Sequence, residues 1–133
     1  MKDTAFLDSG FFIGFLDRSD RLHAGCVRLL DRPPRQLVTS LAVISETYSW
    51  FLHRMGEDAA RQFRLAVADL PGLNLLPLDA GHHHEVTRKL EALRGHKLTY
   101  VDASSLVNLR KLGIAVVWGG DRDLAVEGAR VLP

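Results

Sequence analysis

Cysteine is nearly absent from this 133-residue sequence, which contains only Cys26. One cysteine excludes an internal disulfide and a zinc site built from several cysteines. The sequence also lacks the apolar run of roughly 18 residues that a membrane span needs, and its longest such run, residues 11–16, contains Gly14. The N-terminus has some features of a signal peptide, but Asp3 and Asp8 interrupt them and no small-residue cleavage site follows. These absences predict a cytoplasmic protein without a membrane segment.

An excess of either charge is missing as well, because 17 Lys and Arg face 16 Asp and Glu, for a net charge of +1. That balance argues against a chain that binds polyanions through its overall charge. Internal repeats and low-complexity linkers are also absent. With 47% hydrophobic residues, the composition predicts one domain, residues 1–133, around a single core.

Short apolar segments alternate with helical patterns along the chain. Strands are expected at residues 4–7, 36–39, 73–76, 114–118 and 129–132. Helices are expected from the caps at residues 19 and 20 to the prolines at 33 and 34, and over about 41–55, 57–70, 79–93 and 99–112. Strands separated by helices in one domain predict an α/β fold, a three-layer α/β/α sandwich with a mostly parallel central sheet.

Two aspartates follow predicted strands. Asp8 comes directly after residues 4–7, and Asp121 follows residues 114–118 after Gly119 and Gly120. Ligands of open α/β sheets bind beyond the carboxyl ends of the strands, and glycines let the backbone approach a ligand closely. Each aspartate alone is equally well explained as a turn or capping residue. The pair indicates a site at one edge of the sheet.

Asp102 lies on the apolar face of its predicted helix, which it shares with Leu98, Leu106 and Leu109 at 100° per residue. Burial of a carboxylate raises its pKa or costs several kcal/mol unless a cation or hydrogen-bond donors meet it. Two explanations stay open: a positive charge lies nearby, or Asp102 caps the helix near Thr99.

Glu46 lies away from the main apolar stripe of the helix at 41–55, where a solvated glutamate is the ordinary outcome. Val43 and Trp50 flank it on the same face, however, so that face is not plainly exposed. Glu46 is therefore the weakest of the candidate acids when it is considered alone.

A site that gathers Asp8, Glu46, Asp102 and Asp121 requires a cation, because clustered carboxylates repel one another and raise one another's pKa. Carboxylate oxygens favour Mg²⁺ or Mn²⁺ over zinc. Such a metal lowers the pKa of a bound water, orients it toward phosphorus and neutralises the leaving oxygen. The predicted chemistry is therefore that of phosphate esters.

The four acid-bearing segments resemble, in order, the motifs of the PIN-domain family, especially the VapC-type toxin ribonucleases of toxin–antitoxin pairs. The motifs are FLDS at residues 6–9, TSLAVISE at 39–46, LTYVDASSL at 98–106 and VWGGDRDL at 117–124. Each motif is weak alone, but all four in order at these spacings are a specific signal, and the resemblance covers nearly the whole chain.

The resemblance implies an RNA-cleaving enzyme that uses Mg²⁺ or Mn²⁺ at Asp8, Glu46, Asp102 and Asp121. It further implies an antitoxin that places a basic side chain in the acidic groove, and a homodimer. Gly119 departs from the family, which often has Thr or Ser there. That departure leaves open whether Asp121 or Asp123 faces the metal, with Asp121 favoured.

Two other functions stay open. A phosphatase of the HAD type also has an aspartate after its first strand, but needs a second one two residues later, where this chain has Gly10. A catalytically silent PIN-like module that binds nucleic acid is the other; loss of acids is its usual mark, and all four are present here.

Three further groups of residues have ordinary explanations. The adjacent His82, His83 and His84 point about 100° apart on a helix and are not expected to share a metal ion. Aromatic residues of the helix at 41–55 are expected in the core or at a subunit contact more than as platforms for bases; they are Tyr48, Trp50 and Phe51. The basic residues closest in sequence to the acid-bearing segments or loops, and so the candidates for phosphate contacts, are Arg18, Arg54, Arg94 and Lys97.

Overall fold

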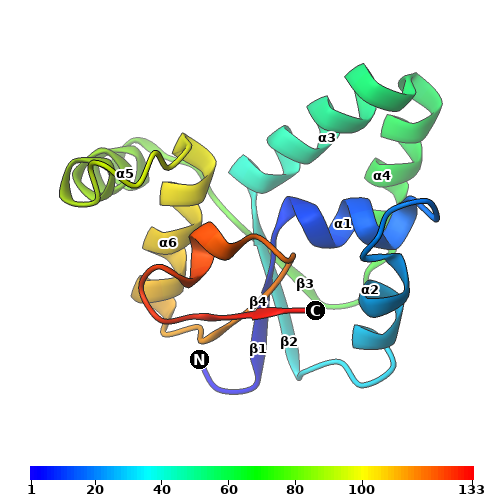
Figure 1. Ribbon diagram of the computed structural model, residues 1–133, viewed down its shortest axis with the longest axis horizontal. Coiled ribbons are helices and arrows are strands. Elements are labelled where there is room, and N and C mark those ends of the chain that lie inside the picture. The colour runs from blue at the N-terminus through cyan, green and yellow to red at the C-terminus, as the bar shows by residue number, and fades with distance from the viewer.

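The computed structural model describes all residues, 1–133, and has three layers (Figure 1). Helices α1 to α4 cover one face of a five-stranded sheet, and α5 and α6 cover the other. This is the predicted α/β/α sandwich. In chain order the elements are β1 (Thr4–Leu7), α1 (Ser9–Leu16), α2 (His23–Leu29), β2 (Gln36–Ser40), α3 (Leu41–Met55), α4 (Glu57–Asp69), β3 (Leu73–Leu76), α5 (Ala80–Ala92), α6 (Tyr100–Leu112), β4 (Val116–Trp118), the short 3₁₀-helix η1 (Arg122–Ala125) and β5 (Arg130–Leu132).

All neighbouring strands of the sheet are parallel, in the order β3-β2-β1-β4-β5. The chain first moves outward from the central strand β1 to β2 and β3. It then crosses the sheet through α5 and α6 and returns to β4 on the other side of β1. The strand order therefore reverses between β1 and β4, and the cleft beyond such a switch point is the usual ligand site of open α/β sheets.

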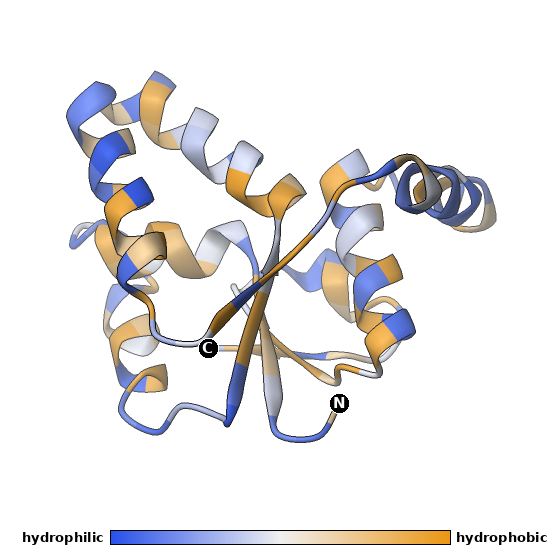
Figure 2. Ribbon diagram, turned by 180° about the vertical axis from the view of Figure 1, so that it is seen from behind, coloured by the Kyte–Doolittle hydropathy of each residue, from blue (hydrophilic) through white to orange (hydrophobic).

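The core lies between the sheet and the helices, and Figure 2 shows hydrophobic residues concentrated in the central strands and in α1. Strand β1 is buried along its whole length, as expected for the central strand of a parallel sheet covered on both faces. Cys26 is fully buried in this core. None of the helices combines the length and the apolar composition of a membrane span.

Helix α1 has no counterpart among the helices predicted from the sequence. Its residues, SGFFIGFL, are apolar around most of the helix and so show no helical periodicity. Phe11 and Phe12 are both buried, one against Trp118 and the other against Phe63. Because the segment is apolar on most sides, its sequence pattern did not indicate a helix.

The helix predicted between the caps at residues 19 and 20 and the prolines at 33 and 34 is shorter at both ends, since α2 spans His23–Leu29. Asp20 accepts a hydrogen bond from the Leu22 N–H ahead of this helix.

The ends of α3 and α6 agree with the sequence signals. Ser40 accepts a hydrogen bond from the N–H of Val43 and begins α3, and Gly56 ends that helix with φ at 96°. Gly113 ends α6 in the left-handed region, with φ at 62°. Both α3 and α6 start at the edge of the sheet where the strands end.

Candidate active site

Asp8 follows β1 directly and lies at the switch point of the sheet. Its N–H donates to the carbonyl oxygen of Trp118 at 2.9 Å, which links the ends of β1 and β4. Its side chain is only 2% exposed. The pKa of Asp8 is raised to about 7, chiefly by burial; the Ser9 backbone amide opposes the shift, and the charges of Glu46, Asp121 and Asp102 contribute to it. Asp8 therefore lies within reach of the three other predicted acids.

Two glycines, Gly10 and Gly119, allow the backbone segments that follow β1 and β4 to lie in close contact. A Cβ at Gly10 would collide with the carbonyl oxygen of Gly119, and a Cβ at Gly119 would lie 2.8 Å from the Cβ of Asp8. Neither approach is tolerated between real atoms. The glycine at 119, which departs from the family pattern, thus has a packing reason in this chain.

Asp102 lies in the first turn of α6 and takes part in a capping box. Its N–H donates to Thr99 Oγ1 at 3.1 Å, and its own Oδ2 accepts from the Thr99 N–H at 3.4 Å. The capping explanation is therefore correct, but it is not the whole explanation. Asp102 is 8% exposed, and burial followed by the charge of Asp121 raises its pKa to about 6. A second acid nearby is thus part of its environment.

Asp121 and Asp123 both lie beside Asp102. Carboxylate oxygens of the three residues are all within 4.8 Å of one another. Asp121 also begins η1, because its Oδ1 accepts a hydrogen bond from the Asp123 N–H at 2.9 Å. The sequence treated Asp123 as the alternative to Asp121, whereas the structure brings both to the cluster. Asp121 is the more buried of the two.

Glu46 faces the same cleft from α3, outside the group formed by Asp102, Asp121 and Asp123. It is half-buried, and its charge contributes to the raised pKa of Asp8. The helix begins at the end of β2, so its second turn passes over the same edge of the sheet. The structure thus places Glu46, Asp102 and Asp121 in the lining of one cleft, and buried Asp8 lies close enough for their charges to raise its pKa.

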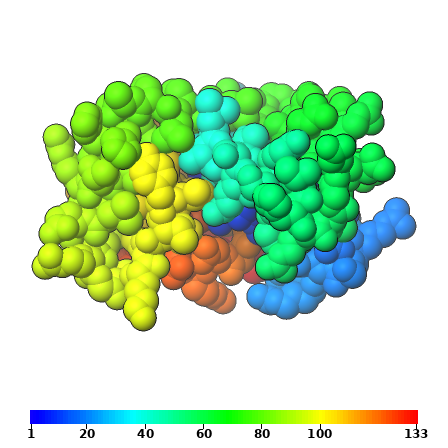
Figure 3. All heavy atoms as spheres, turned by 90° about the horizontal axis from the view of Figure 1, so that it is seen from above, coloured from blue at the N-terminus to red at the C-terminus, as the bar shows by residue number.

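These acids line or adjoin an open cleft of about 620 Å³. Figure 3 shows this face of the molecule from above: α3, α6 and the segment around residue 120 surround a hollow in which atoms of the first ten residues are visible. The lining residues are Ser9, Ile13, Glu46, Ser49, Trp50, His53, Arg54, Thr99, Asp102, Asp121 and Asp123.

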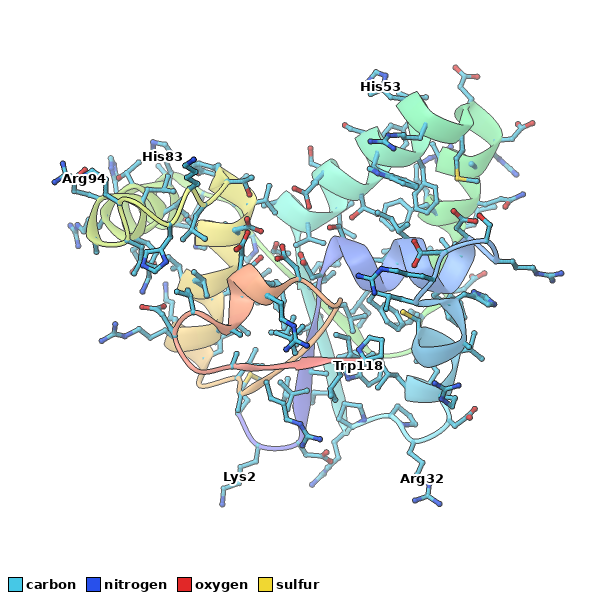
Figure 4. All side chains as sticks on the ribbon, in the orientation of Figure 1. Lys2, Arg32, His53, His83, Arg94 and Trp118 are labelled. Atoms are coloured by element: carbon cyan, nitrogen blue, oxygen red, sulfur yellow. The ribbon has the colours of Figure 1, made fainter.

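Among the four basic residues considered from the sequence, only Arg54 lines this cleft. Arg94 lies just beyond the C-terminal end of α5, away from the cleft (Figure 4), and pairs with Glu91 at 3.2 Å. Arg18 and Lys97 lie outside the lining. Proximity in sequence to the acid-bearing segments was therefore a poor guide to position in space.

Two of the three adjacent histidines contact different residues of α6. His82 is buried and its Nε2 lies 2.7 Å from Ser104 Oγ, whereas His83 Nδ1 lies 2.9 Å from the Tyr100 hydroxyl. These contacts attach α5 to α6. Their role is structural.

The donor set of the cleft fits a hard divalent cation. All candidate ligands are carboxylate oxygens, which suit Mg²⁺ or Mn²⁺ and do not suit zinc. Two of them, Asp8 and Asp102, have raised pKa values. Buried, mutually repelling carboxylates of this kind are stabilised in the ionised form when a cation lies among them.

Comparison with known proteins gives a consistent result. The sequence matches the PIN domain over residues 5–127. No curated protein matches the sequence significantly. Among solved structures, VapC20 of Mycobacterium tuberculosis, a sarcin-ricin loop cleaving toxin, has 25% identity and a TM-score of 0.88, with 97% of this chain and 99% of that chain covered.

Two other solved structures share the fold at lower identity. FitAcB from Neisseria gonorrhoeae is 14% identical with a TM-score of 0.69, covering 97% of this chain and 96% of that one. A toxin–antitoxin complex from Klebsiella pneumoniae is 18% identical with a TM-score of 0.65, at the same coverage. The shared fold extends over essentially the full length of each.

Proposed function

Because this chain belongs to the PIN-domain family, we propose that it is a metal-dependent endoribonuclease that hydrolyses RNA phosphodiester bonds in the cytoplasm as the toxin of a toxin–antitoxin pair. The observation that carries the proposal is the meeting of Asp8, Glu46, Asp102 and Asp121 at the switch point of the sheet. Similarity to a toxin that cleaves the sarcin-ricin loop supports RNA as the substrate.

Mg²⁺ or Mn²⁺ would be held by Asp8, Glu46, Asp102 and Asp121, with Asp123 at the exposed side of the cluster. A bound metal of this kind supplies an activated water and neutralises charge on the leaving oxygen. The chain's own contribution is the placement of its carboxylates. The N–H of Asp123 holds the Asp121 carboxylate, and the Thr99 N–H holds that of Asp102.

An antitoxin is the proposed protein partner, as in the toxin–antitoxin complex that shares this fold. The acidic cleft offers such a partner a site for a basic side chain. Because that side chain would occupy the position of the metal, it would also prevent catalysis.

Cleavage of single-stranded RNA tests the enzyme proposal. Wild type with Mg²⁺ or Mn²⁺ should cut, and EDTA should abolish cutting. Asp8→Asn and Asp102→Asn should cleave orders of magnitude more slowly, because the metal site is lost. Asp8→Asn should still bind RNA at least as well as wild type, since a negative charge facing phosphate has been removed. Glu57→Gln, an exposed carboxylate at the start of α4, is the control and should keep the wild-type rate.

Metal binding is tested separately by thermal melting. A ligand that binds only the folded state raises the melting temperature, so Mg²⁺ or Mn²⁺ should stabilise wild type and have much less effect on the double variant Asp8→Asn/Asp102→Asn. Equal shifts in the two proteins would contradict a shared site.

If both aspartate variants cleave RNA at the wild-type rate, the enzyme proposal is wrong and a silent RNA-binding module takes its place. A phosphatase of the HAD type is disfavoured by geometry. The position of its second aspartate is Gly10, where even a Cβ would collide with the Gly119 carbonyl oxygen.

A further inference from the structure

One face of α3 forms a wall of the acidic cleft. Its lining residues recur every three or four positions, so they lie along one side of the helix. They are Glu46, Ser49, Trp50, His53 and Arg54. The wall changes character along its length: Glu46 lies at its acidic end, and Arg54, eight residues later, lies about 12 Å farther along the helix axis.

Trp50 is held in place on this wall but is not enclosed by the core. Its ring packs edge-on against Phe51, with centroids 5.2 Å apart and planes at 89°. Phe51 is 2% exposed and belongs to the core, whereas Trp50 is only half-buried and lines the cleft. The indole therefore has a fixed position beside the acids and retains surface for a ligand.

Arg54 extends this surface. Its guanidinium carbon lies 5.6 Å from the centroid of the Trp50 ring, within the range of a cation–π contact. The three ion pairs of the chain involve other residues, so Arg54 has no carboxylate partner. A planar cation and an indole thus lie together within one cleft. Figure 4 shows the neighbouring His53 at the outer end of the same helix.

The chemistry of this pair matches an unpaired nucleotide. Bases that are not stacked in a duplex are bound by aromatic rings and by guanidinium planes, and Arg also pairs with phosphate. We propose that Trp50 and Arg54 form a binding site for a single-stranded nucleotide next to the scissile phosphate. Its base stacks on Trp50 and its phosphate contacts Arg54. This inference rests on the proposed ribonuclease function and adds a reason for selecting single-stranded RNA.

Binding measured without cleavage tests the site independently of catalysis. In an Asp8→Asn background, fluorescence anisotropy gives the affinity for a labelled single-stranded RNA of mixed sequence and for its duplex. Replacing Trp50 by Leu should weaken single-strand binding about tenfold or more, the usual size of one base–aromatic stack. Duplex binding should change much less, because duplex bases are already stacked. Trp50→Phe should keep most of the single-strand affinity.

Arg54→Gln should weaken binding of both RNAs and reduce the salt dependence of binding, since one phosphate contact is lost. The matched control is Arg61→Gln, an exposed arginine on α4 outside the cleft. It should leave both affinities unchanged. If Arg54→Gln and Arg61→Gln behave alike, Arg54 is not part of the site.

Tryptophan fluorescence provides a readout that needs no destabilising variant. The chain has only Trp50 and Trp118, and Trp118 is 3% exposed. Stacking of a base should quench the emission of Trp50 as single-stranded RNA is added to the Asp8→Asn protein. In Asp8→Asn/Trp50→Phe the remaining emission should not respond. RNA binding without quenching would overturn the proposal even if Trp50→Leu failed to fold.

Two further results would overturn it. One is that Trp50→Leu, introduced into the Asp8→Asn protein, leaves the affinity for single-stranded RNA unchanged. The other is dissociation of a dimer into monomers by Trp50→Leu in analytical ultracentrifugation, which would assign the indole to a subunit contact. A failed stacking test with normal, aspartate-dependent cleavage would leave the nuclease function intact, whereas loss of cleavage with intact stacking would indicate a binding module.

Discussion

The side chain of Asp8 is the most strongly perturbed acid of the site. It is buried at the junction of β1 and β4, where neighbouring carboxylates oppose its ionisation, and its pKa rises from 3.8 to about 7. At neutral pH the metal-free protein must therefore either retain a proton at Asp8 or bear a buried negative charge. A divalent cation would remove this conflict, so the proposed metal would also stabilise the site.

The metal-free protein should become less stable as the pH rises from about 4 to about 7. In that interval folded Asp8 keeps a proton that the unfolded chain has already lost, so the folded state binds more protons and loses stability on deprotonation. Asp102, with a pKa of about 6, acts in the same direction. Asp8→Asn should remove much of this loss, on the order of 2–4 kcal/mol. Urea unfolding in EDTA across this range measures it, and an unchanged slope in Asp8→Asn would contradict the assignment.

Gly10 offers a second test at the residue scale. In Gly10→Ala the added Cβ would collide with the Gly119 carbonyl oxygen, so the turns bearing Asp8 and Asp121 must separate. Alanine in a helix gains about 1 kcal/mol over glycine, but backbone overpacking typically costs about 1–3 kcal/mol or more. A net loss of stability and of metal binding is therefore expected.

Gly81→Ala in α5 is the matched control, because its Cβ would meet only Asp79 Oδ1 at an ordinary 3.6 Å. This variant should be neutral or slightly stabilising. Chemical denaturation of both variants decides the comparison, and equal effects would mean that the close approach at Gly10 is not under strain.

At the scale of elements, α5 is attached to α6 by two histidine contacts. Buried His82 reaches Ser104, and His83 stacks on Tyr100 at a centroid distance of 5.7 Å. Around them, Val86, Ala103 and Val107 form a small apolar cluster separate from the main core. Because this cluster is small, the polar contacts matter more to the docking of α5 than they would elsewhere in the chain.

Acid should weaken this docking. Burial lowers the pKa of His82 below 6.5, an effect that Lys111 supports and that Glu85 and Asp79 oppose. Below about pH 6.5 the unfolded chain therefore takes up a proton that the folded state resists, so this contribution to stability is lost as the pH falls. Acid therefore lowers the contribution of His82 to stability, whereas it raises that of Asp8.

The pH effects of His82 and Asp8 can be distinguished because the two residues lie in different parts of the structure. Hydrogen exchange in α5 should accelerate on acidification in wild type, relative to the intrinsic exchange rate, and should do so less in His82→Gln. His84→Gln, on the exposed side of α5, is the control. Equal acid sensitivity in the two variants would exclude His82 as the cause.

At the scale of the whole molecule, β3 is an edge strand with exposed apolar residues beside it. Leu75 in β3, Leu41 at the start of α3 and Leu78 after β3 are 49%, 45% and 44% exposed. Leu75 is paired with Thr39 of β2, and Leu41 directly follows the end of β2. The exposed leucines therefore lie near the ends of two neighbouring strands. Apolar surface at a free sheet edge is characteristic of an interface. We propose that a second copy of the chain covers it.

Leu75→Lys should therefore convert a dimer into monomers in analytical ultracentrifugation, because a charge would be buried at the contact. Leu65→Lys, at an exposed position on α4, serves as the control and should not alter the mass. A monomeric wild type at all concentrations would rule out the homodimer.

Local patterns were sufficient to predict the layers and to single out Asp8, Asp102 and Asp121, whereas Glu46 was indicated by the family resemblance. Asp8 follows an apolar strand, Asp102 lies on an apolar helical face and Asp121 follows a pair of glycines. Each of these features can be recognised from neighbouring residues. The rule that ligand sites lie beyond strand ends then indicated that Asp8 and Asp121 belong to one site. Helix α1 escaped detection because its residues are apolar on most sides. Periodicity reports a helix only when one face is polar.

The sequence by itself determined every strand, every α-helix except α1, and which aspartates lie at strand and helix ends, because these depend on side-chain patterns over a few residues. Only the tertiary structure decided that Asp123 joins Asp121 beside Asp102, and that Arg54 rather than Arg94 lines the cleft with Trp50. The physical reason is that such contacts join segments far apart in the chain. They depend on how α6 and α3 cross the sheet, and on the backbone approach that Gly10 and Gly119 permit.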